Sequence, residues 1–184
     1  MDGTLARHWD SWIPGHPEFG KVRPWSPNPN NVKDFFETGV ENTTSLSFGK
    51  GGEDFSMRAT ARVSQGTIPV PNASRDKYDV NISTSLNASD KLTIYANLNA
   101  RVQDTDNYVS SGYTSLASNF SQWWQRQLDM DRLRESYYYN GAFYTWNRKS
   151  ARNAKPQYWD APHYEQYQNT NKNKNSTYSG NFGF

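Results

Sequence analysis

Residues Tyr78 to Val102 read YDVNISTSLNASDKLTIYANLNARV. Apolar or small side chains occupy almost every second position of this stretch, with amides, hydroxyls and charges between them. Side chains of a strand alternate between its two faces, so the spacing predicts two strands that share one apolar and one polar face. The positions expected on the apolar face are Tyr78, Val80, Ile82, Thr84, Leu86 and Ala88, followed by Leu92, Ile94, Ala96, Leu98, Ala100 and Val102.

The register of this hairpin follows from the same pattern. Both apolar sets fall on even numbers, and opposed residues share a face, so the connecting loop must hold an odd number of residues. We expect Ser89-Asp90-Lys91 to be this loop. Strands of about twelve residues extend roughly 40 Å, which is the length that a tilted strand needs to cross a hydrocarbon layer of roughly 30 Å. The expected pairs are Leu86 with Ile94, Ile82 with Leu98 and Val80 with Ala100.

A second hairpin is expected before the first. Its strands would cover 44–50 and 54–65, and their apolar positions change from even to odd numbers. The loop must then hold an even number of residues, and Gly51-Gly52 predicts a two-residue type I′ turn because glycine accepts positive φ at both positions. This turn would place Phe48 opposite Phe55 and Lys50 opposite Glu53.

The chain is expected to divide into four segments. Residues 1–40 are rich in proline and tryptophan and predict a loop followed by a short helix. Residues 41–104 would hold four strands in two hairpins, and residues 105–176 a long aromatic loop that contains a helix. Residues 177–184 alternate again and predict the start of a further strand.

Two helices are expected outside the strands. The first would span 32–37, with Asn30 or Asn31 as its N-cap and Gly39 at its C-terminal end. The second would span about 115–137, because its apolar residues recur at helical spacing. Those residues are Leu116, Phe120, Trp123, Trp124, Leu128, Met130 and Leu133.

Composition excludes several classes of protein. The net charge is +2 with scattered lysines and arginines, so a nucleic-acid partner is not expected. The absence of cysteine excludes disulfides and thiolate chemistry. A mean hydropathy of −0.99 and the lack of a long apolar segment exclude a transmembrane helix, but alternating strands score as polar on average. Tryptophan and tyrosine, with 7 and 12 residues, are unusually frequent and suit membrane interfaces, sugar-binding surfaces and protein interfaces alike.

Short turns alternate with long loops along the chain. Outer-membrane barrels have short periplasmic turns and long extracellular loops. Gly51-Gly52 and Ser89-Asp90-Lys91 would then be periplasmic, whereas 1–40, 66–75 and 105–176 would be extracellular. The expected fold class is therefore all-β: part of a transmembrane β-barrel of antiparallel up-and-down strands, with a long extracellular loop that contains a helix.

Several strings resemble a known family in the same order along the chain. The sequence NNVKDFFETG at 30–39 precedes a strand, a Gly-Gly turn and a second strand, and GTIP at 66–69 and SDKL at 89–92 follow. Gln122-Trp123 and PQYWDAP at 156–162 complete the match. This arrangement, which covers most of 10–168, resembles the SusC/RagA-type TonB-dependent outer-membrane transporters of Bacteroidetes.

The resemblance implies a 22-stranded barrel with an internal plug in the outer membrane of a Gram-negative cell. Such a protein imports glycans or peptides with energy transmitted by TonB and works with a SusD-like surface lipoprotein. We expect this chain to be an internal barrel fragment without the plug and without the TonB-contacting segment. Its partners would be outer-membrane lipid, the SusD-like lipoprotein, an oligosaccharide or peptide substrate and, through the absent N-terminal regions, the TonB complex.

Two sets of residues are candidates for contact with partners. Arg58, Arg62 and Arg101 lie on the expected polar face, where a barrel would turn them toward its lumen or its plug. The aromatic residues of the long loop form the second set, which would stack on a ligand or contact the lid protein; the alternative is that they hold the loop together. This second set comprises Trp123, Trp124, Tyr137, Trp146, Trp159 and Tyr164.

Other patterns predict no catalytic site, metal site or cofactor. His8, His16 and His163 are widely spaced, and the calcium-like start at Asp104 lacks the later ligands of such a loop. The carboxylates Asp129, Asp131 and Glu135 lie among arginines and suit a solvated helix face. We therefore expect no enzyme.

Three functions remain open on the sequence alone. The first is the importer fragment described above. The second is a soluble or surface β-sheet protein that binds carbohydrate, and the third is a SusC-like subunit that has a structural or docking role without transport.

Overall fold

The computed structural model of the protein describes residues 2–109, 112–113 and 115–184. Positions 1, 110, 111 and 114 of the two expected loops lie outside the described residues. The chain forms two compact units. One, the sheet unit, comprises 38–68, 73–108 and 171–184; the other, the aromatic unit, comprises 1–37, 69–72 and 109–170.

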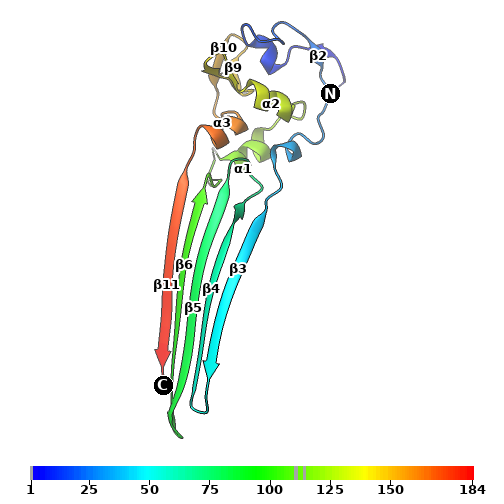
Figure 1. Ribbon diagram of the computed structural model, residues 1–184. Helices are drawn as coiled ribbons and strands as arrows, with labels where there is room; N and C mark the ends of the chain where they lie inside the picture. Colours follow the sequence, from blue (N-terminus) through cyan, green and yellow to red (C-terminus); the bar gives the residue numbers. More distant parts are fainter. Residues whose placement is uncertain (1, 110–111, 114) are drawn as a thin grey trace. The chain divides into compact units, whose positions relative to one another are not determined.

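The sheet unit is one five-stranded antiparallel sheet (Figure 1). Its strands pair in the order β11-β6-β5-β4-β3. Each strand is thus next to the one that precedes it in this sheet, although β7 to β10 come between β6 and β11 in the chain. Their bounds are β3 Glu41–Gly51, β4 Phe55–Thr67, β5 Ser74–Ser89, β6 Leu92–Asp106 and β11 Lys172–Gly183.

The expected register of the central hairpin is confirmed. Leu86 lies opposite Ile94, Ile82 opposite Leu98, and Val80 opposite Ala100. The expected three-residue loop Ser89-Asp90-Lys91 is wrong: the register shifts between Asn87 and Ser89, Ser89 pairs with Leu92, and only Asp90 and Lys91 separate the last pair. β5 has one extra residue at this irregularity. As far as Asn87, the side chains of both strands lie on the faces that the sequence predicts.

The expected Gly51-Gly52 turn is wrong, although the parity argument behind it holds. Phe48 pairs with Ala59 and Gly51 with Ser56, so four residues, 52–55, separate the last pair. Neither Gly51 nor Gly52 has a positive φ, and the amide of Gly52 donates a hydrogen bond to the carbonyl of Phe55 at 2.8 Å. The partner of Phe48 moves by four residues, from Phe55 to Ala59, and a shift by an even number leaves every side chain on its face, so the hydrophobic pattern cannot distinguish the two registers.

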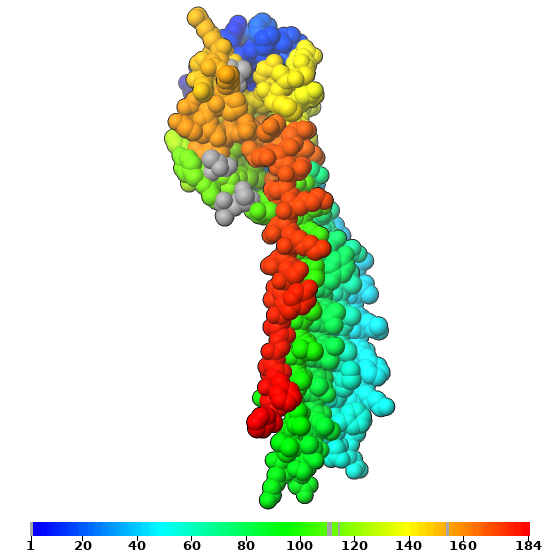
Figure 2. Space-filling model, turned by 90° about the vertical axis from the view of Figure 1, so that its left-hand side faces the viewer, coloured from blue at the N-terminus to red at the C-terminus, as the bar shows by residue number. Residues whose placement is uncertain are grey.

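The last strand begins five residues earlier than expected. β11 starts at Lys172, opposite Asp106 of β6, and pairs along its whole length as far as Gly183 opposite Tyr95. Residues 172–176 read KNKNS and lack the apolar alternation, which is why the sequence does not reveal them as strand. β11, red in Figure 2, is an edge strand of the sheet, with β6 as its neighbour on one side.

The apolar face of the sheet is exposed. Leu46 is 76% exposed, Leu98 59% and Phe182 70%, and the register places all three on one face. Large hydrophobic side chains are normally buried in a protein core. The other large side chains exposed on this face are Phe48, Phe55, Met57, Val63, Tyr78, Val80, Leu86, Leu92 and Tyr178.

The aromatic unit has its own hydrophobic core. Phe35, Leu128, Met130, Leu133 and Trp146 pack in it with Leu116. The unit has little regular structure, in keeping with its prolines and glycines. Its elements are β1 Leu5–Ala6, η1 Trp9–Trp12, β2 Arg23–Pro24, η2 Lys33–Phe35, α1 Leu116–Ser118, η3 Asn119–Trp123, α2 Met130–Ser136, β7 Tyr138–Tyr139, β8 Ala142–Phe143, β9 Arg148–Ser150, β10 Asn153–Pro156 and α3 Pro162–Tyr167.

The single helix expected at 115–137 is wrong. The chain forms α1 and then η3, which is a π-helical turn, and becomes extended at Trp124. A new helix, α2, starts after Asp129, whose carboxylate accepts hydrogen bonds from the amides of Asp131 and Arg132. The periodic apolar residues continue across the break because both helices face the same core, so periodicity alone does not reveal it.

The helix expected at 32–37 is shorter than predicted. Only the 3-10 turn η2 forms, and the backbone is already extended at Phe36, before Gly39. Asn31 is near its expected capping position: its side-chain oxygen accepts a hydrogen bond from the amide of Val32 at 2.8 Å. None of the helices in the described residues is long and apolar enough to cross a membrane.

A buried ion-pair network joins distant parts of the aromatic unit. Asp10 is fully buried, and its carboxylate contacts Arg23 at 2.6 Å and Arg132 at 3.4 Å. Glu18 contacts the same two guanidinium groups at 2.9 and 3.3 Å. A buried carboxylate is tolerated only when it is paired in this way, so the network fixes the N-terminal segment against α2.

His163 is the most strongly perturbed titratable group that the structure shows. It is 1% exposed, lies against the rings of Phe35 and Tyr137, and its pKa is lowered to about 4, first by burial and then by the charge of Arg134. The neutral ring is therefore the form that the folded core accepts.

The register of β3 and β4 predicts which engineered cysteine pair forms a disulfide. The hydroxyl oxygens of Ser47 and Thr60 lie 3.1 Å apart, whereas Ser56 is four residues, or roughly 13 Å, further along β4. In a chain without native cysteine, S47C/T60C should oxidise readily and S47C/S56C should not. Mobility on non-reducing gels reports which variant forms the disulfide. A disulfide in S47C/S56C but not in S47C/T60C would support the Gly51-Gly52 turn instead.

Burial of His163 predicts a pH dependence of stability. Since its folded pKa of about 4 lies below the usual 6.5, the unfolded chain binds more protons between these values, and stability should fall as the pH drops from about 6.5 toward 4. H163Q should flatten this decline in thermal unfolding followed over pH. Equal slopes for H163Q and the wild type would contradict the assignment.

Candidate functional site

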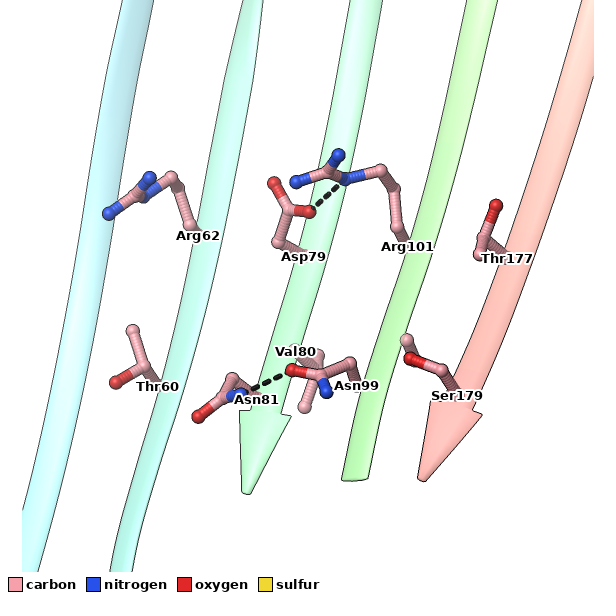
Figure 3. Close-up of a pocket in the computed structure, with 10 residues that line it drawn as sticks. Thr60, Arg62, Asp79, Val80, Asn81, Asn99, Arg101, Thr177 and Ser179 are labelled. Atoms are coloured by element: carbon pink, nitrogen blue, oxygen red, sulfur yellow. Dashed lines mark hydrogen bonds and ion pairs between the residues drawn. The ribbon is translucent and has the colours of Figure 1, made fainter. Parts of the chain in front are cut away.

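The polar face of the sheet carries a shallow hollow of about 420 Å³. Two rows of side chains line it, one from each of two neighbouring levels of the sheet (Figure 3). Strand alternation places them there, because their neighbours in sequence point to the apolar face. The first row is Arg62, Asp79, Arg101 and Thr177, and the second is Thr60, Asn81, Asn99 and Ser179.

Hydrogen bonds link the centre of this hollow. Nε of Arg101 donates to Oδ1 of Asp79 at 2.5 Å, and the side-chain amide of Asn81 donates to the oxygen of Asn99 (Figure 3). Both contacts join β5 to β6 across a pair of opposed residues. Such cross-strand pairs stabilise a sheet by a few tenths of a kcal/mol to about 1 kcal/mol each.

The face carries an excess of positive charge. Arg58, Arg62 and Arg101 lie on it, as the sequence predicts, and only Arg101 has an ion-pair partner among the described residues. The residue of β5 opposite Arg58 is Ser83, which has no negative charge to pair with it. Arginine donates hydrogen bonds in a fixed planar arrangement, so the two free guanidinium groups can bind carboxylates, phosphates or carbonyl oxygens of whatever lies against this face.

The six aromatic residues expected as a contact surface do not form one surface. Trp146 and Trp159 are 6% and 3% exposed, and the indole of Trp159 donates a hydrogen bond to the carbonyl of Tyr113 at 3.3 Å. Trp124 packs edge-on against Trp146 with ring centres 5.5 Å apart. These contacts match the alternative that the residues hold the loop together.

The remaining three are divided between packing and exposure. Tyr137 lies parallel to His163 with ring centres 6.0 Å apart, and Tyr164 packs edge-on against Phe143 at 4.7 Å. Trp123 is 54% exposed, 5.5 Å from Trp159. Of the six, only Trp123 thus presents most of its indole to solvent.

Several of the other polar groups weighed in the sequence have ordinary partners. Asp131 pairs with Arg134 at 3.0 Å, and Asp129 caps α2. His16 shares a hydrogen bond with the hydroxyl of Ser136 at 3.1 Å. Within the described ranges, no group of three or more histidine and acidic side chains lies close enough to hold a metal ion.

A second hollow, in the aromatic unit, was not expected from the sequence. We call it the indole pocket; it has a volume of about 240 Å³ and lies between the N-terminal segment and the segment that contains β9. The signal in the sequence is the presence of three tryptophans, Trp9, Trp12 and Trp25, within the first 25 residues. Its lining includes Arg7, His8, Trp9, Trp12, Trp25, Trp146 and Arg148.

Comparisons with known proteins identify no relative. No family model matches the sequence, and no curated protein matches it either.

Proposed function

We propose that the chain is part of the barrel wall of a TonB-dependent outer-membrane importer that resembles the SusC/RagA type. The apolar face of the sheet would contact lipid, and the polar face would look into the lumen or onto the plug. The substrate would be a glycan or a peptide, and the partners would be the SusD-like lipoprotein and the TonB complex. The substrate and these partners rest on the resemblance alone.

The observation that carries the proposal is the exposed apolar face. Its side chains are aligned in rows across all five strands: Leu46, Ala61, Val80, Ala100 and Tyr178 form one such row. In water a face of this kind favours aggregation, and its two unpaired edge strands add to the hazard. Hydrocarbon solvates such a face, and neighbouring barrel strands would pair with both edges.

The height of the apolar band fits a membrane. A polar row crosses the same face two residues before Tyr78, on the side away from the β5–β6 turn; it contains Gln65, Asp76 and Asp104. From Val102, opposite Tyr78, to Leu92 the apolar run of β6 extends by roughly 33 Å, which corresponds to roughly 25 Å across a membrane at a tilt near 40°. The outward apolar band of outer-membrane barrels is about 25 Å tall.

Aromatic side chains lie toward both ends of this band. Tyr78 is next to the polar row, and Phe55 and Phe182 lie toward the opposite end. Aromatic residues are enriched where a barrel meets the two membrane interfaces. Their positions support an orientation with the strands across the bilayer.

The two alternative functions differ in what must cover the sheet and in what the full-length protein must contain. A soluble carbohydrate-binding sheet needs a second layer over Leu98, which is 59% exposed. A SusC-like subunit without transport would have the same sheet as the importer. The presence of a plug and of a TonB-contacting segment in the full-length protein would separate the importer from this third function.

The lipid-facing assignment predicts opposite outcomes for two adjacent arginine substitutions. I82R would place a charge on the apolar face near the middle of the band, at a cost of about 2–4 kcal/mol. S83R would place the same side chain on the polar face, one residue away. In the full-length protein, I82R should lower the amount of folded protein in the outer membrane, and S83R should leave it near the wild-type level.

Surface proteolysis and heat-dependent gel mobility measure assembly in both variants. Normal assembly of I82R, or equal loss in both, would overturn the lipid-facing assignment. If neither variant folds and the wild-type chain is soluble and monomeric, the result would instead favour a sheet covered on each side by protein.

A further inference from the structure

The indole pocket has the size of a site for one small ring. Its volume of about 240 Å³ lies below the range of about 300–1,000 Å³ that is usual for larger ligands. The half-buried indoles of Trp9, Trp12 and Trp25 provide flat apolar walls. Indoles combine an apolar face with a polar N–H, so they suit ligands that have both kinds of surface.

The pocket is positively charged. Arg7 and Arg148 line it, and no aspartate or glutamate does among the described residues. Neither arginine has an ion-pair partner in the part of the chain that the structure describes, unlike Arg23 and Arg132, which share Asp10 and Glu18. The pocket thus contains two guanidinium groups whose charge no carboxylate of the described chain balances.

Arg148 is held rigidly at the pocket wall. Its three nitrogens donate to the backbone carbonyls of Ser150, Trp9 and Ala151 at 3.1, 3.0 and 2.6 Å. These carbonyls fix the direction of the guanidinium but carry no full negative charge, and burial lowers the pKa of this side chain. An anion in the pocket would supply the missing charge at a group that is already in position.

Arg7 is placed differently. Its guanidinium carbon lies 4.7 Å from the centre of the Trp12 ring, an arrangement in which cation and ring attract each other. The side chain is exposed. It can therefore turn from solvent toward a ligand without breaking an ion pair.

Two buried nitrogens of lining residues have no hydrogen-bond partner among the residues that the structure describes. They are Nε1 of Trp146, whose side chain belongs to a residue that is 6% exposed, and Nε2 of His8. The indole nitrogen is a donor only, so its partner must be an acceptor. Buried polar groups without partners are uncommon in folded proteins, so this wall of the pocket is left without its full set of hydrogen bonds.

Neutral polar side chains complete the lining. Gln125, Gln127 and Ser150 contribute amides and a hydroxyl, and Gln127 is buried. Such groups pair with hydroxyls and need no charge on the ligand. A ligand that satisfies the whole lining has a flat apolar ring face, several hydroxyls and one negative charge.

We propose that the indole pocket binds one acidic sugar residue, a pyranose ring that bears a carboxylate. The ring lies against the indoles, the carboxylate faces Arg7 and Arg148, and the hydroxyls meet the amides of Gln125 and Gln127. The pocket belongs to the aromatic unit, and its test does not depend on transport or on the lipid-facing sheet.

Titration of the full-length protein in detergent with glucuronate tests the proposal. Quenching of tryptophan fluorescence should saturate with glucuronate, whereas glucose and acetate should each bind at least about tenfold more weakly, because glucose lacks the charge and acetate lacks the ring. The absence of saturable glucuronate binding would overturn the proposal. Equal binding of glucuronate and glucose, or of glucuronate and acetate, would do the same.

Three arginine variants locate the site. R7Q and R148Q should each weaken glucuronate binding by about tenfold, and R152Q, an exposed arginine outside the lining, should bind as the wild type does. Near-ultraviolet circular dichroism verifies that each variant is folded. Because Arg148 also holds three carbonyls, R7Q decides the outcome if R148Q does not fold: unchanged binding in R7Q would place the ligand elsewhere.

Discussion

An antiparallel sheet with one apolar and one polar face needs a cover for the apolar face, and this requirement governs the sheet unit. The five strands expose aligned rows of large hydrophobic side chains, with Leu46 and Tyr178 more than 70% exposed at opposite edges. Such a surface is stable in contact with lipid or with protein. Its height, its polar upper boundary and the positions of its aromatic side chains fit lipid, and the proposed barrel follows from that fit.

The aromatic unit is stabilised in a different way. It has short helices, short strands and a small core, to which a buried network of Asp10, Arg23 and Arg132 adds a long-range connection. Most tryptophans of this unit contribute to packing. The same packing leaves one hollow in which Arg7 and Arg148 remain without carboxylates. A segment that looks from its composition like a long loop therefore contains an ordered core and a candidate binding pocket.

The accuracy of the sequence-based predictions depended on which physical rule each one used. Alternation gave the faces of the strands and the pairing of Ile82 with Leu98, because these follow from the two-residue period. It did not give the β3–β4 turn, since a slip of four residues, like any even number, preserves both faces. The helix expected at 115–137 was broken at Trp124, where the local backbone changes while the apolar spacing continues.

The sequence alone determined the central hairpin, the polar position of Arg58, Arg62 and Arg101, and the aromatic character of the flanking segments. Tertiary structure decided that β11 begins at Lys172, where pairing with β6 compensates for a segment without apolar alternation. It also decided which tryptophans are buried and which line a pocket. Alternation is a local property that a strand carries by itself, whereas burial and pockets arise from contacts between residues far apart in sequence, such as Trp9 and Arg148.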